Sequence, residues 1–486
     1  MKTCTAPSPT DSPNCTMANR NSRFTGSILF LTGHLAEPRL RRILTAMEPL
    51  PFAATIRDLG LQVAGLMTTD LIRRRLPRTE ITSERVIVPG RCRGDLVELS
   101  RDYGIEFMRG PDDVGDLPGF LAQGESPAAE VDYSTSCRIF AEITNAPLMT
   151  IDEILKRAES FKADGAAVID LGCLPESPFA HLAESVQALK QAGYLVSVDS
   201  ASTVELEIGA RAGCDYLLSL TEETLDLAFE TKAIPVIIPT GDDPESLYRA
   251  ADRLTAAGKE FIADPILAPI GFGLAQSLNA YSQCRQRLPV ARILMGIGNL
   301  TELTDADTSG IHAMLFGVIA EFGITEVLTV QDSPHCRRAI AEAAAARQLC
   351  FAAVAENRLP QIVHSPLLTL RDRSPFSTSP QEIAATVAEV RDANYRIEVA
   401  VDGIHLYNRD GHWIESRAED FAPVLIEQVD SGHGFYLGGE LARAEIAFKL
   451  GKRFTQDEEL DWGIATDKRT ENILAHKTSG KTRKKK

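Results

Sequence analysis

The feature that most constrains this 486-residue sequence is a series of eight apolar, strand-like runs between residues 138 and 350. The runs are RIFAEIT from Arg138, AAVIDLG from Ala166, YLVSVDS from Tyr194, DYLLSL from Asp215, PVIIPT from Pro235, EFIADP from Glu260, RILMGIGN from Arg292 and EVLTVQD from Glu326. Each is followed by an amphipathic helical stretch. Parallel strands that are buried on both faces read as continuous apolar runs. Eight consecutive strand–helix units therefore predict an α/β fold with a (β/α)8 barrel rather than a doubly wound sheet.

The residues on either side of the predicted barrel, 138–350, have different patterns. Residues 25–125 alternate strand-like runs such as SILFLTG with helical runs such as DLVELSRDYG, which predicts a small N-terminal α/β domain. Residues 365–465 contain helical runs and an alternating stretch around NRDG, a hairpin signal, so we expect a C-terminal α+β module. We expect residues 1–24 to be a disordered tail, residues 109–137 a linker and residues 466–486 a basic tail.

Composition excludes several classes of function. The formal net charge of -16 disfavours broad nucleic-acid binding, because an acidic surface repels phosphates. No apolar stretch has the length needed to span a bilayer, so no membrane association is expected. The nine cysteines are scattered without C-x-x-C spacing, which is typical of a reducing compartment, and the N-terminus has no signal-peptide core. These features predict a cytoplasmic protein.

Polar residues occur where the apolar runs end, and active sites of (β/α)8 barrels lie at the carboxyl ends of the strands. Aspartates stand at four of these ends, as Asp170, Asp199, Asp264 and Asp332. An ionised carboxylate accepts hydrogen bonds and donates none, so the set favours a ligand rich in N–H donors, such as a pterin or guanine ring. For each aspartate taken singly, a helix-capping or turn-forming role stays open.

Four motifs, each at a predicted strand end, resemble those of the pterin-binding barrel family that includes dihydropteroate synthase. They are EITNAP from Glu142, GAAVIDLG from Gly165, SVDS from Ser197 and ADPILAPIGFG from Ala263. The resemblance implies a TIM barrel of the pterin-binding type. It extends over about residues 25–465, where the chain looks like a dihydropteroate synthase-related protein of the kind associated with tetrahydromethanopterin-linked one-carbon metabolism.

The resemblance implies roles for individual residues. The aspartates that match the family's pterin ligands are Asp199 and Asp264, and Asn145 matches an asparagine close to a diphosphate and its Mg²⁺. We expect the pterin to contact Asp170, Asp199, Ser219, Asp264, Gly298 and Gln331, and we expect Asn145 and Asn299 to be catalytic. The expected partners are a pterin and an arylamine. A homodimer is the candidate oligomeric state.

The expected reaction is the joining of a dihydropterin-methyl diphosphate to an arylamine, as in tetrahydromethanopterin or folate biosynthesis. Synthases of the family carry S-R-K after the seventh strand and R-x-H at the eighth, where this chain has GNLTE and VQDSP. Those cations neutralise the leaving diphosphate. Their absence keeps two alternatives open: methyl transfer from N5 of a reduced pterin to a corrinoid, with Asn299 near N5, and pterin binding without catalysis.

Two features outside the predicted barrel are candidates for binding. GRCRGD, at Gly90–Asp95, places Arg91 and Arg93 before a helix and is interpreted either as an anion site or as a solvated capping loop. His405, His412 and His433 match no metal-binding spacing and are interpreted as surface or turn residues.

Overall fold

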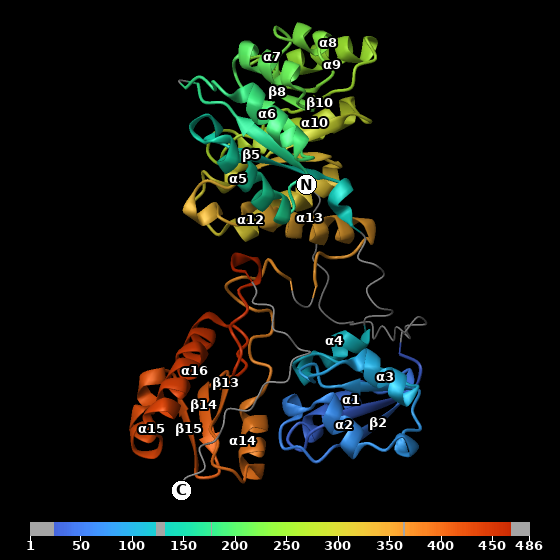
Figure 1. Ribbon diagram of the computed structural model, residues 1–486, viewed down its shortest axis with the longest axis vertical. Coiled ribbons are helices and arrows are strands. Elements are labelled where there is room, and N and C mark those ends of the chain that lie inside the picture. The colour runs from blue at the N-terminus through green and yellow to red at the C-terminus, as the bar shows by residue number, and fades with distance from the viewer. Residues whose placement is uncertain (1–23, 123–131, 176, 363–364, 468–486) are drawn as a thin grey trace, which may run out of the picture. The chain divides into compact units, whose positions relative to one another are not determined.

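The computed structural model describes residues 24–122, 132–175, 177–362 and 365–467 (Figure 1). The described residues form two compact units, the first made of residues 24–122 and 376–434 and the second of the described residues in the ranges 132–375 and 435–467. Residues 1–23 of the expected N-terminal tail and most of the expected basic tail lie outside the described residues, whereas Phe24 is buried in an apolar cluster and is not part of a tail. Among the described residues, no helix combines the length and apolar composition that a membrane-spanning segment requires.

The N-terminal part of the first unit is a parallel four-stranded sheet in the order β2-β1-β3-β4. Its strands are β1 (Gly26–Thr32), β2 (Phe52–Asp58), β3 (Arg85–Val88) and β4 (Glu106–Arg109), and its helices are α1 (Glu37–Ala46), α2 (Thr69–Arg75), α3 (Leu96–Tyr103) and α4 (Leu117–Ala122). Separate apolar clusters contain Leu29 and Phe30, adjacent residues of β1 whose side chains point to opposite faces. The sheet is therefore packed on both sides, as its apolar strands predict.

Helix α4 corrects the interpretation of residues 109–137 as a linker. Leu117 and Leu121 are buried in the same apolar cluster as Ile28 and Phe30 of β1. The local glycines and prolines indicated a loop, but these two leucines, four positions apart, lie on one helical face and pack against the sheet.

The remainder of the first unit contains an antiparallel sheet in the order β13-β14-β15. Its elements are α14 (Pro380–Glu389), β13 (Arg396–Ala400), β14 (Gly403–Asn408), β15 (Gly411–Glu415) and α15 (Ala422–Gln428). The turn predicted at NRDG joins β14 to β15, and a second tight turn before Gly403 makes the hairpin a three-stranded meander. Helix α16 (Ser431–Leu450) follows α15, and its residues from 435 onward belong to the second unit.

The second unit contains a closed parallel barrel in the order β10-β11-β12-β5-β6-β7-β8-β9. The strands are β5 (Arg138–Ile143), β6 (Val168–Gly172), β7 (Leu195–Asp199), β8 (Tyr216–Leu220), β9 (Ile234–Ile237), β10 (Ile262–Ala263), β11 (Arg292–Gly296) and β12 (Glu326–Val330). Each coincides with one of the eight apolar runs, β9 starting one residue earlier than its run, so the predicted (β/α)8 barrel is confirmed.

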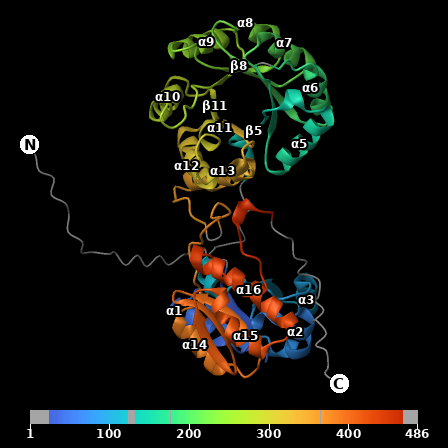
Figure 2. The same ribbon diagram turned by 90° about the vertical axis from the view of Figure 1, so that its left-hand side faces the viewer.

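Helices surround the barrel, as the end-on view in Figure 2 shows. They are α5 (Ile151–Ala163), α6 (Leu182–Gln191), α7 (Thr203–Ala212), α8 (Asp226–Glu230), α9 (Glu245–Ala256), α10 (Leu274–Arg287), α11 (Gly298–Thr301), α12 (Thr308–Phe322) and α13 (Ala339–Ala355). Their apolar faces and the outward-facing strand residues form the largest core cluster. A capping box of Thr150 and Glu153 fixes the start of α5 just beyond the carboxyl end of β5.

Candidate functional site at the barrel mouth

The inner face of the barrel is apolar in the middle and acidic at the carboxyl ends of the strands. Phe140, Val168 and Ile262 belong to an apolar cluster inside the barrel. Side chains alternate along a strand, so residues two positions further on point to the same interior. Those residues are Glu142 on β5, Asp170 on β6 and Asp264, which directly follows β10.

The amino ends of the strands offer a contrast. There the buried Glu326 accepts hydrogen bonds from Arg138 at 3.0 Å and from Arg292 at 2.8 Å. A buried carboxylate with two guanidinium partners is neutralised within the protein and needs no ligand. At the opposite end, none of the carboxylates of Glu142, Asp170, Asp199 and Asp264 forms an ion pair with a described residue.

Three of these carboxylates form a compact group, which we call the acidic triad: Glu142, Asp170 and Asp199. One oxygen from each lies within 4.8 Å of the others. Strand register produces this grouping, because Glu142 pairs with Asp170 across β5 and β6, and Gly172 pairs with Asp199 across β6 and β7. The triad thus spans three neighbouring strands.

Asp170 is fully buried at the centre of the triad. Its Oδ1 accepts a short hydrogen bond from the hydroxyl of Ser197, its neighbour on β7. Its Oδ2 is buried and has no hydrogen-bond partner. Leaving a buried acceptor unsatisfied costs free energy, so this oxygen is a place where a ligand would be stabilised.

The crowding of these buried or half-buried carboxylates favours their neutral forms. Burial, together with the charges of Asp199 and Asp332, raises the pKa of Glu142 to about 7. Burial and the charge of Asp264 raise the pKa of Asp199 to about 6. Burial, followed by the charges of Asp199 and Glu142, holds the pKa of Asp170 well above its usual value. A bound cation or a donor-rich ligand would relieve this unfavourable electrostatic energy.

Asp264 lies on the far side of the mouth from Asp199, since β8 and β9 separate their strands in the barrel. The Tyr281 hydroxyl of α10 donates to Asp264 Oδ1 at 2.6 Å, and the backbone N–H of Ile266 donates to the same oxygen at 2.8 Å. Burial nevertheless raises the pKa of Asp264 to about 6. Both contacts use one oxygen, so they orient the carboxylate and leave the other oxygen open.

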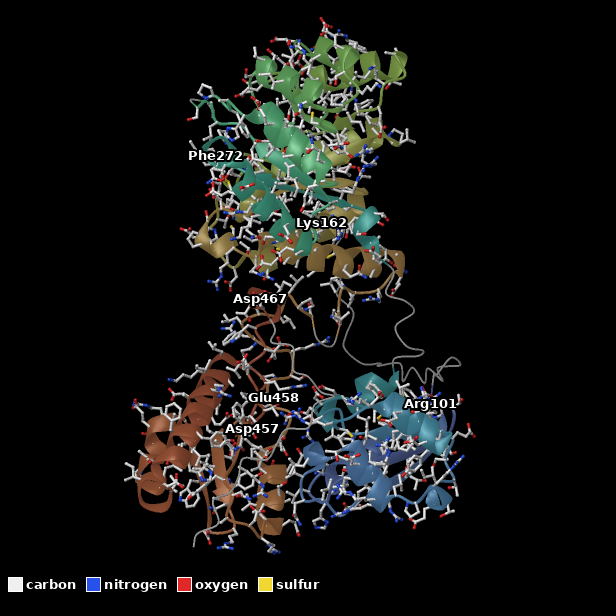
Figure 3. All side chains as sticks on the ribbon, viewed as in Figure 1. Arg101, Lys162, Phe272, Asp457, Glu458 and Asp467 are labelled. Atoms are coloured by element: carbon white, nitrogen blue, oxygen red, sulfur yellow. The ribbon has the colours of Figure 1, made fainter. Side chains whose placement is uncertain are left out.

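The loop after Asp264 explains the unusual sequence ADPILAPIGFG. Gly271 and Gly273 have φ values of +84° and +112°, a backbone region that favours glycine. Between them Phe272 is 83% exposed, and Ile270 is 60% exposed. Figure 3 marks Phe272 on the barrel unit. The chain therefore turns sharply and presents apolar side chains beyond the acidic group.

The remaining predicted site residues have local partners. Asn299 Nδ2 donates to the carbonyl oxygen of Leu267 at 2.7 Å, which connects α11 to the loop after β10. Gln331 Oε1 accepts from the N–H of Ile340 at 3.3 Å, a contact with α13. Ser219 is half-buried near the end of β8.

Gly298, which was expected to contact the pterin, and Thr301, three residues later, have packing roles. A Cβ at Gly298 would come within 3.0 Å of the side chain of Val330, so glycine permits α11 to pack closely on β12. Thr301 is buried and donates to Ile297 O within its own turn.

Asn145 is exposed and lines a separate hollow of 590 Å³. The same hollow is lined by Lys156 and Arg157 of α5. It also includes Glu153, whose Oε2 is engaged by the N–H and the hydroxyl of Thr150 at 2.8 Å each. Two cations and one occupied carboxylate do not suit a divalent cation, so the surroundings of Asn145 do not fit the Mg²⁺ that the resemblance implies.

Two residues of the site escaped the sequence interpretation. Glu142 stands in the EITNAP motif, which was interpreted through Asn145 alone, although strand alternation after the apolar Phe140 indicates that Glu142 faces inward. Tyr281 lies 17 residues after Asp264, in a helical stretch with no local signal of function. Its role follows only from the packing of α10 against the barrel.

The two candidates outside the barrel have structural explanations. At GRCRGD, Asp95 caps α3 with its own carboxylate, which accepts from the N–H groups of Val97 and Glu98. This capping does not favour binding of an anion at that helix end. The interpretation of His405 as a surface or turn residue is wrong, because it is 1% exposed, with Asp402 at 2.9 Å from its Nε2 and His412 at 2.9 Å from its Nδ1.

Comparison with known proteins shows several similarities. Residues 26–112 match a family of unknown function (DUF6513). The uncharacterized protein MJ0107 of Methanocaldococcus jannaschii is 25% identical, over 89% of this chain and 98% of that protein.

Solved structures with a similar chain path include dihydropteroate synthases. The Yersinia pestis enzyme with a pterin-sulfa conjugate has a TM-score of 0.36 and 18% identity, covering 45% of this chain and 94% of that one. The 7,8-dihydropteroate synthase of Vibrio fischeri ES114 has a TM-score of 0.37 and 16% identity, with the same coverages. The barrel assignment itself rests on the closed strand order of this chain.

Proposed function

We propose that the barrel mouth binds a reduced pterin and that the protein is a transferase acting on it. The observation that carries the proposal is the pair of half-buried carboxylates, Asp199 and Asp264, placed across the mouth without a cation partner among the described residues. The ring N–H and exocyclic amine of a pterin are donors that a carboxylate can accept in pairs. The four sequence motifs that resemble the pterin-binding family support the same ligand.

Each side of the mouth would contribute to binding the ring. Tyr281 and the Ile266 N–H hold Asp264 through Oδ1, which leaves Oδ2 for the ligand. The exposed ring of Phe272 is available to cover a flat heterocycle. A site with a polar edge and an apolar cover is typical of small-molecule pockets.

The reaction that we propose first is the joining of a dihydropterin-methyl diphosphate to an arylamine. The amine nitrogen attacks the methylene carbon, a C–N bond forms, the C–O bond to diphosphate breaks, and the amine loses a proton. Asn299 donates through Nδ2 to Leu267 O, so its Oδ1 is the atom available to accept an N–H from the amine or the ring. Orientation of the two reactants would supply much of the rate enhancement.

The charge of the mouth favours a second candidate, methyl transfer from N5 of a reduced pterin to a corrinoid. Four carboxylates lie at the mouth, and none of them is paired with a cation among the described residues. This negative environment repels a diphosphate. A methylated pterin carries no diphosphate and avoids this repulsion. Asn299 would then hydrogen-bond near N5.

The test is a fluorescence titration of the full chain with reduced pterins that carry hydroxymethyl, hydroxymethyl diphosphate or N5-methyl groups. We expect micromolar binding, weakened about 10- to 100-fold in Asp264→Asn, because a charge-assisted hydrogen bond contributes about 1.5–3 kcal/mol. Asp332→Asn, which removes a nearby charge, is the control and should bind normally. Absence of binding to the folded wild-type protein would overturn the proposal.

Turnover assays then separate the reactions. Diphosphate release that requires an arylamine supports the synthase. Methylation of a reduced corrinoid by the N5-methyl pterin supports the methyltransferase. Pterin binding with neither activity supports a binding protein and removes the transferase part of the proposal.

A further inference from the structure

The acidic triad has more acceptor oxygens than one pterin edge can satisfy. Neither Glu142 nor Asp199 accepts a side-chain hydrogen bond from any described residue, and Asp170 Oδ2 is buried without a partner. If Asp199 and Asp264 bind the ring, the Glu142 carboxylate and Asp170 Oδ2 still lack donors. We propose that Glu142, Asp170 and Asp199 together hold a divalent cation inside the barrel mouth.

The burial of Asp170 distinguishes this site from a solvated acidic patch. Asp170 is 0% exposed, and Ser197 fixes its Oδ1, so the unpartnered Oδ2 has no access to bulk water. A charge that is removed from water needs a compensating partner. The described residues supply no cation to Asp170, whereas Glu326 at the other end of the barrel has two arginines.

The space around Glu142 is kept free by a glycine. A Cβ at Gly172 would lie 2.6 Å from Glu142 Oε1 and 3.3 Å from the carbonyl oxygen of Ile143. Any side chain at residue 172 would therefore displace the carboxylate from the triad. Because residue 172 has no side chain, the carboxylate of Glu142 can lie close to Asp170 and Asp199 and bind the same ligand.

The donor set selects a hard cation. Three carboxylates and no thiolate or imidazole favour Mg²⁺, Mn²⁺ or Ca²⁺ over Zn²⁺ or Cu⁺. Oxygens on opposite sides of Mg²⁺ are about 4.2 Å apart, and around Ca²⁺ about 4.6–5.2 Å. The triad oxygens lie within 4.8 Å of one another, a separation in the range that a shared hard cation spans, and water would fill the other coordination positions.

This site differs from the position that the family resemblance implies. Asn145 lies in a hollow lined by Lys156 and Arg157, whereas the triad contacts neither of these cations. The cation site requires no pterin and can be tested without one. Failure of the proposed function and failure of the cation site are therefore separate outcomes.

The experiment uses the full-length protein after removal of metal with EDTA, with no pterin present. Mn²⁺ is titrated and followed by its electron paramagnetic resonance signal, and Mg²⁺ and Ca²⁺ are then added as competitors. We expect one Mn²⁺ per chain, displaced by at least one of the competitors. No stoichiometric Mn²⁺ binding by the folded protein would overturn the inference.

Variants locate the site. Glu142→Gln and Asp199→Asn keep the size of the side chains, and each should weaken Mn²⁺ binding at least about tenfold. Asp152→Asn removes an exposed acid of α5 that is outside the triad, and it should leave binding unchanged. Circular dichroism and thermal melting verify that the variants fold. Equal Mn²⁺ affinity in all three folded variants would place the cation elsewhere and contradict the proposal.

Discussion

At the scale of the single residue, Glu142 makes the stability of the protein depend on pH. Its pKa is raised from 4.5 to about 7 in the folded chain. Between these values the folded state keeps a proton that the unfolded state has lost, so this group's contribution to stability falls as pH rises through that window. In EDTA, we expect Glu142→Gln to be more stable than the wild type at pH 8 by about 1–3 kcal/mol, and equal to it near pH 4.5.

Urea unfolding at the two pH values measures this difference. A gain in stability that is the same at pH 4.5 and pH 8 would show that the pKa of Glu142 does not change on folding. The same measurement on Asp332→Asn gives the change in stability when an exposed carboxylate at the edge of the mouth is removed.

The ionisation of Asp264 predicts how pterin binding depends on pH. Its pKa of about 6 means that the carboxylate form, which accepts the N–H groups, is lost below that pH. We expect the dissociation constant to be nearly constant from pH 7 to 8 and to rise about tenfold per unit below pH 6. Fluorescence titration from pH 5 to 8 measures it. Asp264→Asn should show a shallower transition, which Asp199 retains because its pKa is also raised to about 6. An identical pH profile in the variant would assign the dependence to another group.

At the scale of the element, the carboxyl end of β6 determines the arrangement of the triad. Gly172→Ala places a methyl group 2.6 Å from Glu142 Oε1, and the flexible carboxylate is the group that can move. We expect Mn²⁺ binding to weaken at least about tenfold, while the free energy of unfolding falls by only about 1–2 kcal/mol. Gly296→Ala, at the end of β11 with no atom within 4 Å of the new Cβ, is the matched control and should change neither. Unaltered Mn²⁺ affinity in Gly172→Ala would argue against Glu142 as a ligand.

Elements also show how far the sequence predicts this fold. The eight barrel strands can be recognised in the sequence because strands that are buried on both faces consist of apolar runs. Asp170, Asp199 and Asp264 can be recognised as charges at the ends of those runs. Tyr281 could not be found, because its contact with Asp264 depends on how α10 packs. Helix α4 was missed because its stability comes from burial of Leu117 and Leu121 rather than from local propensity.

At the scale of the whole molecule, the chain returns to the barrel unit after leaving it, since residues 435–468 belong to the same unit as residues 131–375. Lys452 contacts residues of the segment that follows the barrel. It is 0% exposed, and its Nζ donates to Thr369 O at 3.2 Å and lies 3.4 Å from Asp372. The ammonium also lies 5.1 Å from the centre of the Trp462 ring. This lysine joins the segment that follows the barrel to the C-terminal segment.

Lys452→Ala should therefore destabilise the barrel unit by about 2–4 kcal/mol, because it leaves Asp372 without its buried cation and opens a cavity. Lys449, three residues earlier, is exposed, and among the described residues it pairs with Glu445 of its own helix alone, so Lys449→Ala should change stability little. Thermal unfolding of the full chain, followed by circular dichroism, compares the two. If both variants melt like the wild type, residues 435–468 contribute little to the barrel unit, and the interactions of Lys452 are not needed for its stability.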